Sequence, residues 1–176
     1  LHETYIIAQG QDSILIIDQH AAHERLTYEK LLSALAANGP ATHLLLLPEL
    51  VTLSAADTRV LARRAADLKT FGLVIDLFGQ NTIAVREVPA LLVKADIKRL
   101  MTDLAETLRA FGDTVLLKDK IKDVCARMAC HGSIRAGRTL TVPEMNALLR
   151  QIEACGTSGQ CIHGRPTYIE LNLNDI

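Results

Sequence analysis

Two short β-rich runs begin the chain, Thr4–Ala8 (TYIIA) and Ser13–Asp18 (SILIID), and Gly10-Gln11-Asp12 lies between them. A short connection with Gly and Asp between apolar runs predicts a β-hairpin. A helix is expected to follow directly, from about Gln19 to Ala37, and Asn38-Gly39-Pro40 ends it. The first forty residues therefore predict a hairpin that leads into a long helix.

The remaining sequence predicts further helices and strands. Apolar residues recur at helical spacing from Ile97 to Phe111, and Gly112 stands where a C-terminal cap belongs. Other helices are expected from Ser54, from about 117 to 134, and from the capping box of Thr141 and Glu144. Other strands are expected at 44–53, 73–78, 82–88 and 167–173. The fold class is α/β or α+β, and the breaks near 40 and 112 bracket a middle segment inserted into a framework built from both chain ends.

Composition excludes several classes of protein. Hydrophobic residues make up 49% and charged residues 22%, which is typical of a globular domain. The net charge of -1 provides no global basic field. Any contact with DNA must therefore come from a local cluster of basic residues or from a surface outside this domain. The uncharged stretch from Leu31 to Pro48 is broken before it could cross a bilayer, so no membrane span is expected. Four cysteines without a secretory leader indicate reduced thiols in a cytoplasmic protein, and the start at Leu1 indicates an excised domain.

The first group of chemically interesting residues is Asp18-Gln-His-Ala-Ala-His-Glu24, at the junction of strand and helix. His20 and Glu24 fall on one helical face, and Glu29 lies roughly opposite His20. An imidazole and a carboxylate at i and i+4 are a common pair of metal ligands, and Asp18 could reach the same ion. The other interpretation is an N-capping Asp18 followed by a solvated helix surface.

The second group is Cys161-Ile-His163-Gly-Arg165-Pro166 in a glycine-bearing loop. A thiolate and an imidazole one residue apart can bind one borderline-soft ion such as zinc. A loop cysteine beside a surface histidine remains the alternative.

The helical cysteines differ in their positions. Cys125 follows the apolar stripe of its helix and is expected to be an inert core residue. Cys130 lies about 180° from Ile121, on the face that the apolar pattern leaves polar, where a thiol suits a ligand better than packing. Cys155, just before Gly156, is expected to be a core residue at a helix end.

Three motifs together resemble the MutL family of mismatch-repair proteins. The spacing Asp18-Gln-His-Ala-x-x-Glu24-x-x-x-x-Glu29 matches the endonuclease signature of that family in full. Ala129-Cys130 resembles its Ala-Cys-Arg motif, and Cys161-x-His163-Gly-Arg-Pro166 resembles its Cys-Pro-His-Gly-Arg-Pro motif. The resemblance covers essentially the whole chain and points to the C-terminal domain of those members that nick DNA themselves.

The resemblance implies a mixed-sheet dimerisation and active-site subdomain at residues 1–40 and 115–176, with an inserted smaller α/β regulatory subdomain at 41–114. It implies a metal site for zinc and manganese, and an ATP-binding N-terminal part elsewhere in the protein. The implied metal ligands are His20, Glu24, Cys130, Cys161 and His163. The resemblance also implies that Asp18, His20 and Glu24 are catalytic. It implies that Glu29 and Arg165 contact the ligands without binding the metal themselves.

The sequence departs from the family pattern at three places. Ile162 replaces the usual Pro, and His131 replaces the usual Arg or Lys, which removes a fixed positive charge near the scissile phosphate. The family binds a sliding clamp through Gln-x-Leu-Leu-x-Pro, and here the corresponding stretch is His43-Leu-Leu45-Leu46-Leu-Pro48. A buried strand is the other interpretation of this leucine run.

The expected function is metal-dependent nicking of double-stranded DNA by a homodimer, within the bacterial cytoplasm at the nucleoid. The implied partners are the sliding clamp, the mismatch-recognition protein MutS and DNA, which this domain alone should bind weakly. A non-catalytic, zinc-stabilised dimerisation module is the alternative. A Cys/His nucleophilic hydrolase using Cys161 or Cys130 is a third option.

Overall fold

The computed structural model describes residues 4–112, 115–132, 140–155 and 166–172. Contacts divide the chain into two compact units. The terminal unit comprises Leu1–Glu29 and Ser133–Ile176, and the central unit comprises Lys30–Gly132. The division falls within α1 (Gln19–Ala37), and the assignment of dimerising and regulatory roles at residues 40 and 115 stays a prediction.

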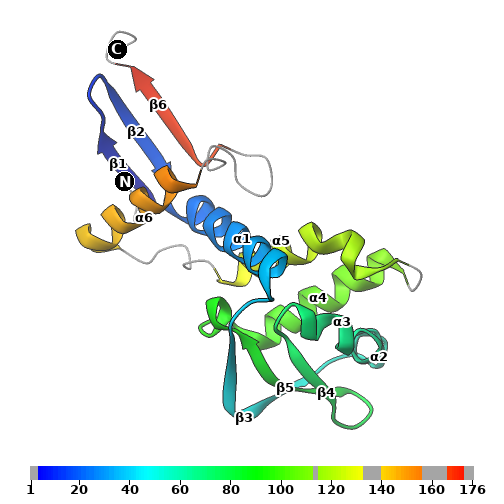
Figure 1. The fold of residues 1–176 in the computed structure, drawn as a ribbon. Coiled ribbons are helices and arrows are strands. Elements are labelled where there is room, and N and C mark those ends of the chain that lie inside the picture. The colour runs from blue at the N-terminus through cyan, green and yellow to red at the C-terminus, as the bar shows by residue number, and fades with distance from the viewer. Residues whose placement is uncertain (1–3, 113–114, 133–139, 156–165, 173–176) are drawn as a thin grey trace. The chain divides into compact units, whose positions relative to one another are not determined.

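A three-stranded antiparallel sheet of order β1-β2-β6 forms the base of the terminal unit (Figure 1). Its strands are β1 (Tyr5–Gln9), β2 (Ser13–Asp18) and β6 (Tyr168–Asn172). The central strand β2 pairs with β1 across the turn at residues 10–12 and with β6 from the other end of the sequence. Ser13 Oγ also donates to Glu170 Oε1 over 2.7 Å, which joins the two chain ends through side chains.

One face of this sheet is covered by α6 (Val142–Ala154) and the first turns of α1. Figure 1 shows α6 crossing this face. Thr141 and Glu144 form a complete capping box at the start of α6, as the sequence predicts. The core between sheet and helices consists of buried apolar residues, namely Ile6, Ile17, Ala22, Leu26, Leu140, Leu148 and Ile152.

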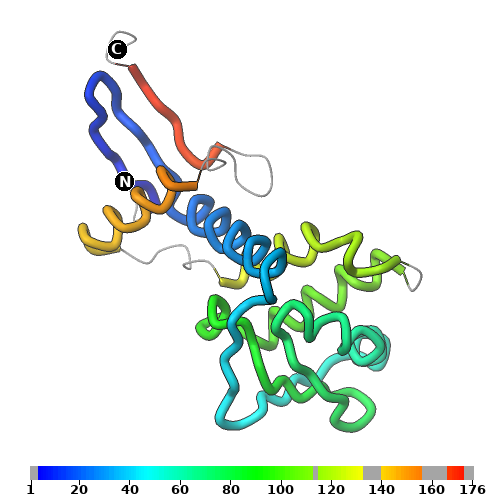
Figure 2. Tube along the Cα trace, in the orientation of Figure 1, coloured from blue at the N-terminus to red at the C-terminus, as the bar shows by residue number. Residues whose placement is uncertain are grey.

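A second antiparallel sheet, of order β3-β5-β4, belongs to the central unit. Its strands are β3 (Thr42–Thr52), β4 (Val74–Leu77) and β5 (Thr82–Pro89). The register of β3 against β5 shifts between Leu44 and Glu49, and Figure 2 shows the cyan chain turning sharply there. The residues of this irregular part do not alternate between core and solvent.

Helices of the central unit pack on the second sheet and on one another. They are α2 (Ala55–Arg63), α3 (Ala65–Thr70), η1 (Ala90–Leu92), α4 (Ile97–Phe111), η2 (Leu117–Lys120) and α5 (Ile121–Gly132). Ser54 caps α2 and Asp96 caps α4, each by accepting a backbone N–H three residues on. The apolar side chains on the inward faces of these helices are buried, and Leu61, Leu104 and Met128 are completely buried.

The predicted α+β class is confirmed, and most elements lie where the sequence places them. The expectation of a mixed sheet is wrong for the described strands, whose pairings are all antiparallel because tight hairpins join β1 to β2 and β4 to β5. The predicted helix at 117–134 is divided, since its first turn is the 3-10 helix η2. Among the described residues, no helix is both long enough and apolar enough to span a membrane.

Candidate metal centre and docking surfaces

Asp18 sits at the point where β2 becomes α1. Its Oδ1 accepts the backbone N–H groups of His20 over 2.9 Å and of Ala21 over 3.0 Å. These bonds satisfy two of the four amide groups that a helix leaves without partners at its start. The N-capping interpretation of Asp18 is therefore confirmed, and the cap fixes where His20 lies on the first turn of α1.

His20 and Glu24 face one another on adjacent turns of α1. His20 Nε2 lies 3.3 Å from Glu24 Oε1, with the Glu24 side chain 9% exposed and that of His20 38% exposed. Two ligands that bind one ion tetrahedrally through bonds of about 2.0 to 2.1 Å are separated by about 3.3 to 3.4 Å. This separation equals that of two ligands on one divalent ion, and it is also the distance of an ion pair, with His20 the more exposed of the two side chains.

Glu29 lies one turn further along the helix surface and has another partner. Arg25 Nη2 lies 2.6 Å from Glu29 Oε1, and the Arg25 guanidinium stacks 5.6 Å from the ring centre of Tyr28. These contacts tie Glu29 into the surface of α1. Its role behind the metal ligands stays a prediction.

The two cysteines of α5 differ in burial. Cys125 is fully buried between apolar neighbours, and burial raises the pKa of its thiol to about 12. This thiol stays protonated at neutral pH and is a core residue, as predicted. Cys130 is half-buried near the end of the helix, next to His131.

The remaining predicted site residues belong to the motif at 161–166. Cys161, His163 and Arg165 lie outside the described residues, so their contribution to a metal site stays a prediction. Within residues 4–112, 115–132, 140–155 and 166–172, no three His, Cys, Asp or Glu side chains gather as a metal-binding group. His20 and Glu24 belong to the terminal unit and Cys130 to the central unit.

The leucine run forms a strand, but the strand is not buried. In β3, Leu46 is completely exposed, Leu44 and Leu47 are 67% and 83% exposed, and Leu45 is half-buried. The register shift of β3 turns these side chains away from the core. The buried-strand interpretation of this run is therefore wrong, and the predicted clamp-binding residues His43, Leu46 and Pro48 are accessible.

A second apolar surface lies on the sheet of the terminal unit, on the face opposite α6. Tyr5 and Ile7 of β1 and Ile169 and Leu171 of β6 are all exposed, from 39% to 55%. The registers Ile7↔Ile16↔Ile169 and Ile14↔Leu171 place the side chains of all three strands on this face. The sequence predicts the strand at 167–173 that contains Ile169 and Leu171, but it does not predict that Tyr5 and Ile7 lie on the same face, because the pairing of the chain ends cannot be read from spacing alone.

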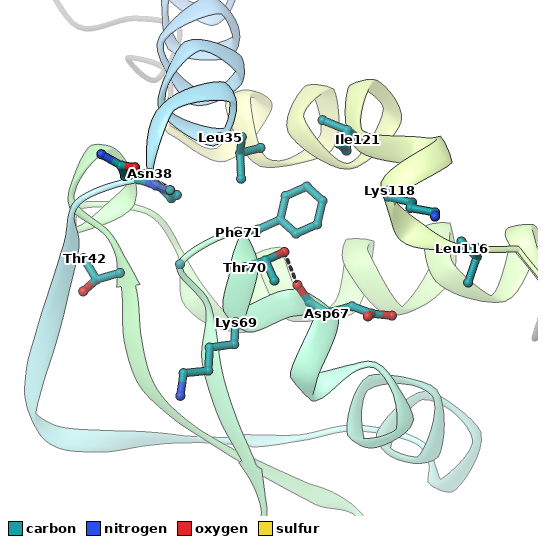
Figure 3. Close-up of a pocket in the computed structure, with 13 residues that line it drawn as sticks. Leu35, Asn38, Thr42, Asp67, Lys69, Thr70, Phe71, Leu116, Lys118 and Ile121 are labelled. Atoms are coloured by element: carbon teal, nitrogen blue, oxygen red, sulfur yellow. Dashed lines mark hydrogen bonds between the residues drawn. The ribbon is translucent and has the colours of Figure 1, made fainter.

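The central unit also has a cavity of about 700 Å³ that contains none of the motif residues. Figure 3 shows Phe71 between Leu35 and Ile121 at its base, with Lys69 and Lys118 at its sides. Thr70 Oγ1 donates to the Asp67 carbonyl over 2.7 Å in its wall. The apolar and basic side chains that line this cavity do not indicate which molecule it would bind.

The fold and its apolar sheet face define an α+β domain of the kind that associates with other chains. The family model described as "MutL C terminal dimerisation domain" matches residues 1–140. The chain therefore belongs to the MutL family, and the matched region is its C-terminal dimerisation domain.

Relatives named DNA mismatch repair protein MutL match along all 176 residues. Identity is 54% to the protein of Phenylobacterium zucineum (strain HLK1), 55% to that of Rhodopseudomonas palustris (strain BisA53) and 52% to that of Caulobacter vibrioides (strain NA1000 / CB15N). The chain covers 28%, 29% and 28% of these proteins, respectively, so it spans less than a third of their length.

The cap at Asp18 predicts different effects for two substitutions. Asp18→Ala removes both capping bonds and should lower the free energy of unfolding by about 1 kcal/mol. Asp18→Asn retains a capping oxygen and should lower the free energy of unfolding by only a few tenths of about 1 kcal/mol. Urea unfolding followed by circular dichroism measures both. An equal loss for the two variants would show that the capping bonds contribute little.

Proposed function

We propose that this chain is the homodimerisation and metal-dependent endonuclease domain of a mismatch-repair protein, which nicks double-stranded DNA by phosphodiester hydrolysis. The observation that carries the proposal is the pairing of His20 with the nearly buried carboxylate of Glu24. Burying a carboxylate is costly unless a cation or hydrogen-bond donors compensate. A divalent ion bound by both side chains would place a cation directly on this carboxylate.

The predicted ligand set joins hard and soft donors. Glu24 supplies an oxygen, His20 and His163 supply nitrogens, and Cys130 and Cys161 supply sulfurs. Thiolate and imidazole favour zinc, whereas a carboxylate also suits manganese. A divalent ion at this site would polarise a phosphoryl oxygen and lower the pKa of a bound water.

The side chains of α1 have distinct tasks in this reaction. The cap formed by Asp18 fixes the first turn, so His20 and Glu24 keep the separation that one ion needs. The burial of Glu24 excludes competing water from its carboxylate, and the exposure of His20 leaves room for a phosphate to approach.

A zinc-stabilised dimerisation module without catalysis is the second candidate. The family description favours dimerisation and does not mention cleavage. Structural zinc sites usually close with Cys and His alone, and the carboxylate of Glu24 argues for the catalytic alternative. The two candidates differ in what happens when manganese and supercoiled DNA are supplied.

Glu24 and Glu29 provide a matched pair of substitutions for that test. In the full-length protein, Glu24→Ala should abolish manganese-dependent nicking of a supercoiled plasmid, because it removes a ligand. Glu29→Ala removes a carboxylate from the same helix and should retain most of the activity. Gel analysis of nicked circles measures both variants. A wild-type protein that binds zinc but never nicks with manganese would support the non-catalytic module.

We assign the homodimer interface to the exposed apolar face of the β1-β2-β6 sheet. A stable interface buries roughly 800 Å² per partner around an apolar centre. Three adjacent strands with isoleucines in register provide such a centre. In a symmetric dimer, the same apolar face of a second copy of this chain would cover the face of the first.

Replacing Ile169 with Asp should dissociate the dimer, because an unpaired charge would be buried at the centre of the interface. Light scattering at micromolar concentration should then give the 19.2 kDa mass of one chain instead of twice that value. Leu77→Asp is the matched control, since Leu77 is similarly exposed but belongs to the central unit. A dimer that persists in Ile169→Asp would place the interface on another surface.

We assign the sliding-clamp contact to β3, with Leu45, Leu46 and Pro48 as apolar anchors and His43 as the polar residue. The exposure of Leu46 supports this assignment, because an accessible leucine can insert into a pocket of a partner. With a net charge of -1, the domain alone should bind DNA weakly and with steep dependence on salt, so nicking should depend on the N-terminal region of the protein or on the clamp. MutS would supply recognition of the mismatch, in the cytoplasm at the nucleoid.

Leu46→Asp should abolish stimulation of nicking by the clamp and leave metal content unchanged. Leu50→Asp, on the same strand but outside the motif, is the matched control and should retain stimulation. His43→Gln restores the residue of the family motif and should increase clamp affinity. Nicking assays with and without the clamp measure all three variants. Stimulation that survives Leu46→Asp in a folded protein would show that the contact lies elsewhere.

A further inference from the structure

The sheet of the central unit contains one extra residue on β5. Val74 and Ile75 are consecutive on β4, but they pair with Glu87 and Val85, which are two positions apart on β5. Arg86 therefore lies between two pairs and is the extra residue of a β-bulge. A bulge re-aims the side chain that it carries and changes which face the following side chains take.

The register of β3 against β5 shifts at the same place, between Leu44 and Glu49. The four residues between them, Leu45–Pro48, stand against Arg86 alone. We call Leu45–Pro48 the leucine bulge, and its Leu46 is completely exposed. The position of the extra residue in β5 therefore decides which residues of β3 leave the pairing with β5.

The core requires an extra residue at this point but does not determine which one it is. Val85 and Val88 are both completely buried. Side chains three positions apart in a regular strand point to opposite faces, so one residue between these two valines must be extra. Arg86 and Glu87 are the two candidates. If Glu87 were the extra residue, β3 would leave β5 at a different residue, and a shift of one position turns side chains to the other face.

The ion pair between Arg86 and Asp76 favours one of the two candidates. Asp76 follows Ile75, which is buried, so Asp76 points to the outer face of the sheet. Arg86 Nε pairs with Asp76 Oδ2, and the two side chains are 50% and 53% exposed. Glu87 in the same position would place a like charge beside Asp76, which destabilises a cross-strand pair. The charges on β4 and β5 therefore favour Arg86 as the extra residue.

We propose that the Asp76–Arg86 ion pair presents the leucine bulge to the clamp by setting the point at which β3 leaves the sheet. Asp76 and Arg86 are then positioning residues for the docking surface and do not themselves contact the partner. The inference rests on the proposed function, because it requires β3 to bind the clamp. It makes docking depend on residues of β4 and β5 that lie outside the leucine motif.

The affinity of the full-length protein for the clamp tests the inference. Asp76→Ala and Arg86→Ala should each weaken binding about 2- to 5-fold, which is the size expected for an exposed ion pair. Asp76→Arg should weaken binding further, because the introduced cation repels Arg86 and attracts Glu87. Isothermal titration calorimetry with the purified clamp measures these affinities, and Leu46→Asp defines complete loss.

Two rescue variants separate control of the register from direct contact with the partner. Arg86→Lys keeps the charge and should retain most of the affinity. Asp76→Arg combined with Arg86→Glu and Glu87→Arg exchanges all three charges, so the same residue is again attracted and its neighbour again repelled. This variant should restore the affinity. Arg109→Ala is the matched control and should leave the affinity unchanged, since Arg109 is also 50% exposed and belongs to the same unit.

Hydrogen exchange provides a readout that does not require the clamp. In Asp76→Arg, amide groups in the peptide that covers β3 should exchange faster, because two registers then compete. The midpoint of urea unfolding should change little, since the Asp76 side chain is about half exposed and is not part of the core. Exchange of all three charges should return the β3 peptide to the rate of the wild type.

The possible results distinguish the inference from the proposed function. If Leu46→Asp leaves clamp binding unchanged, the clamp contact itself is wrong. If Leu46→Asp abolishes binding but affinity survives the substitutions of Asp76 and Arg86, the contact stands and the positioning role is overturned. If Arg86→Lys retains affinity but the exchange of three charges does not restore it, Arg86 contacts the partner directly, which also overturns the positioning role.

Discussion

The pairing of β2 with strands from both ends of the sequence is the constraint on which the terminal unit depends. β2 takes hydrogen bonds from β1 on one side and from β6, more than 150 residues later, on the other. The same strand ends at Asp18, whose carboxylate starts α1. Sheet closure therefore fixes the first turn of α1, and with it the separation of His20 and Glu24. It also turns one apolar face of the three strands outward.

Local sequence was sufficient for features that depend on neighbouring residues. The β1–β2 turn, the capping of α2 by Ser54 and the capping box of α6 each depend on residues within a few positions of one another. The facing of His20 and Glu24 follows from helical periodicity alone. The exposure of Leu46 and the bond between Asp103 and His131 depend on a strand irregularity and on packing across 28 positions. Periodicity contains no information about either.

The charges of the two units differ in sign. Residues 30–132 contain 14 of the 19 Lys and Arg but only 11 of the 20 Asp and Glu, so the rest of the chain is acidic. An acidic environment suits divalent cations and repels a phosphate backbone. Under the proposed function, a nuclease with this distribution of charge would need another surface to hold the duplex. Under the same proposal, the exposed leucines of β3 would attach the domain to a clamp that encircles the DNA.

The replacement of the family's Arg or Lys by His131 changes what this position can do. A long cation next to Cys130 could reach toward a scissile phosphate, whereas the imidazole is shorter and is held by Asp103. Because burial lowers its pKa, His131 contributes little charge at neutral pH. Under the proposed function, the charge of the phosphate would have to be balanced by the bound ion or by other cations. The position has exchanged a long, flexible cation for an imidazole whose direction is set by a carboxylate of α4.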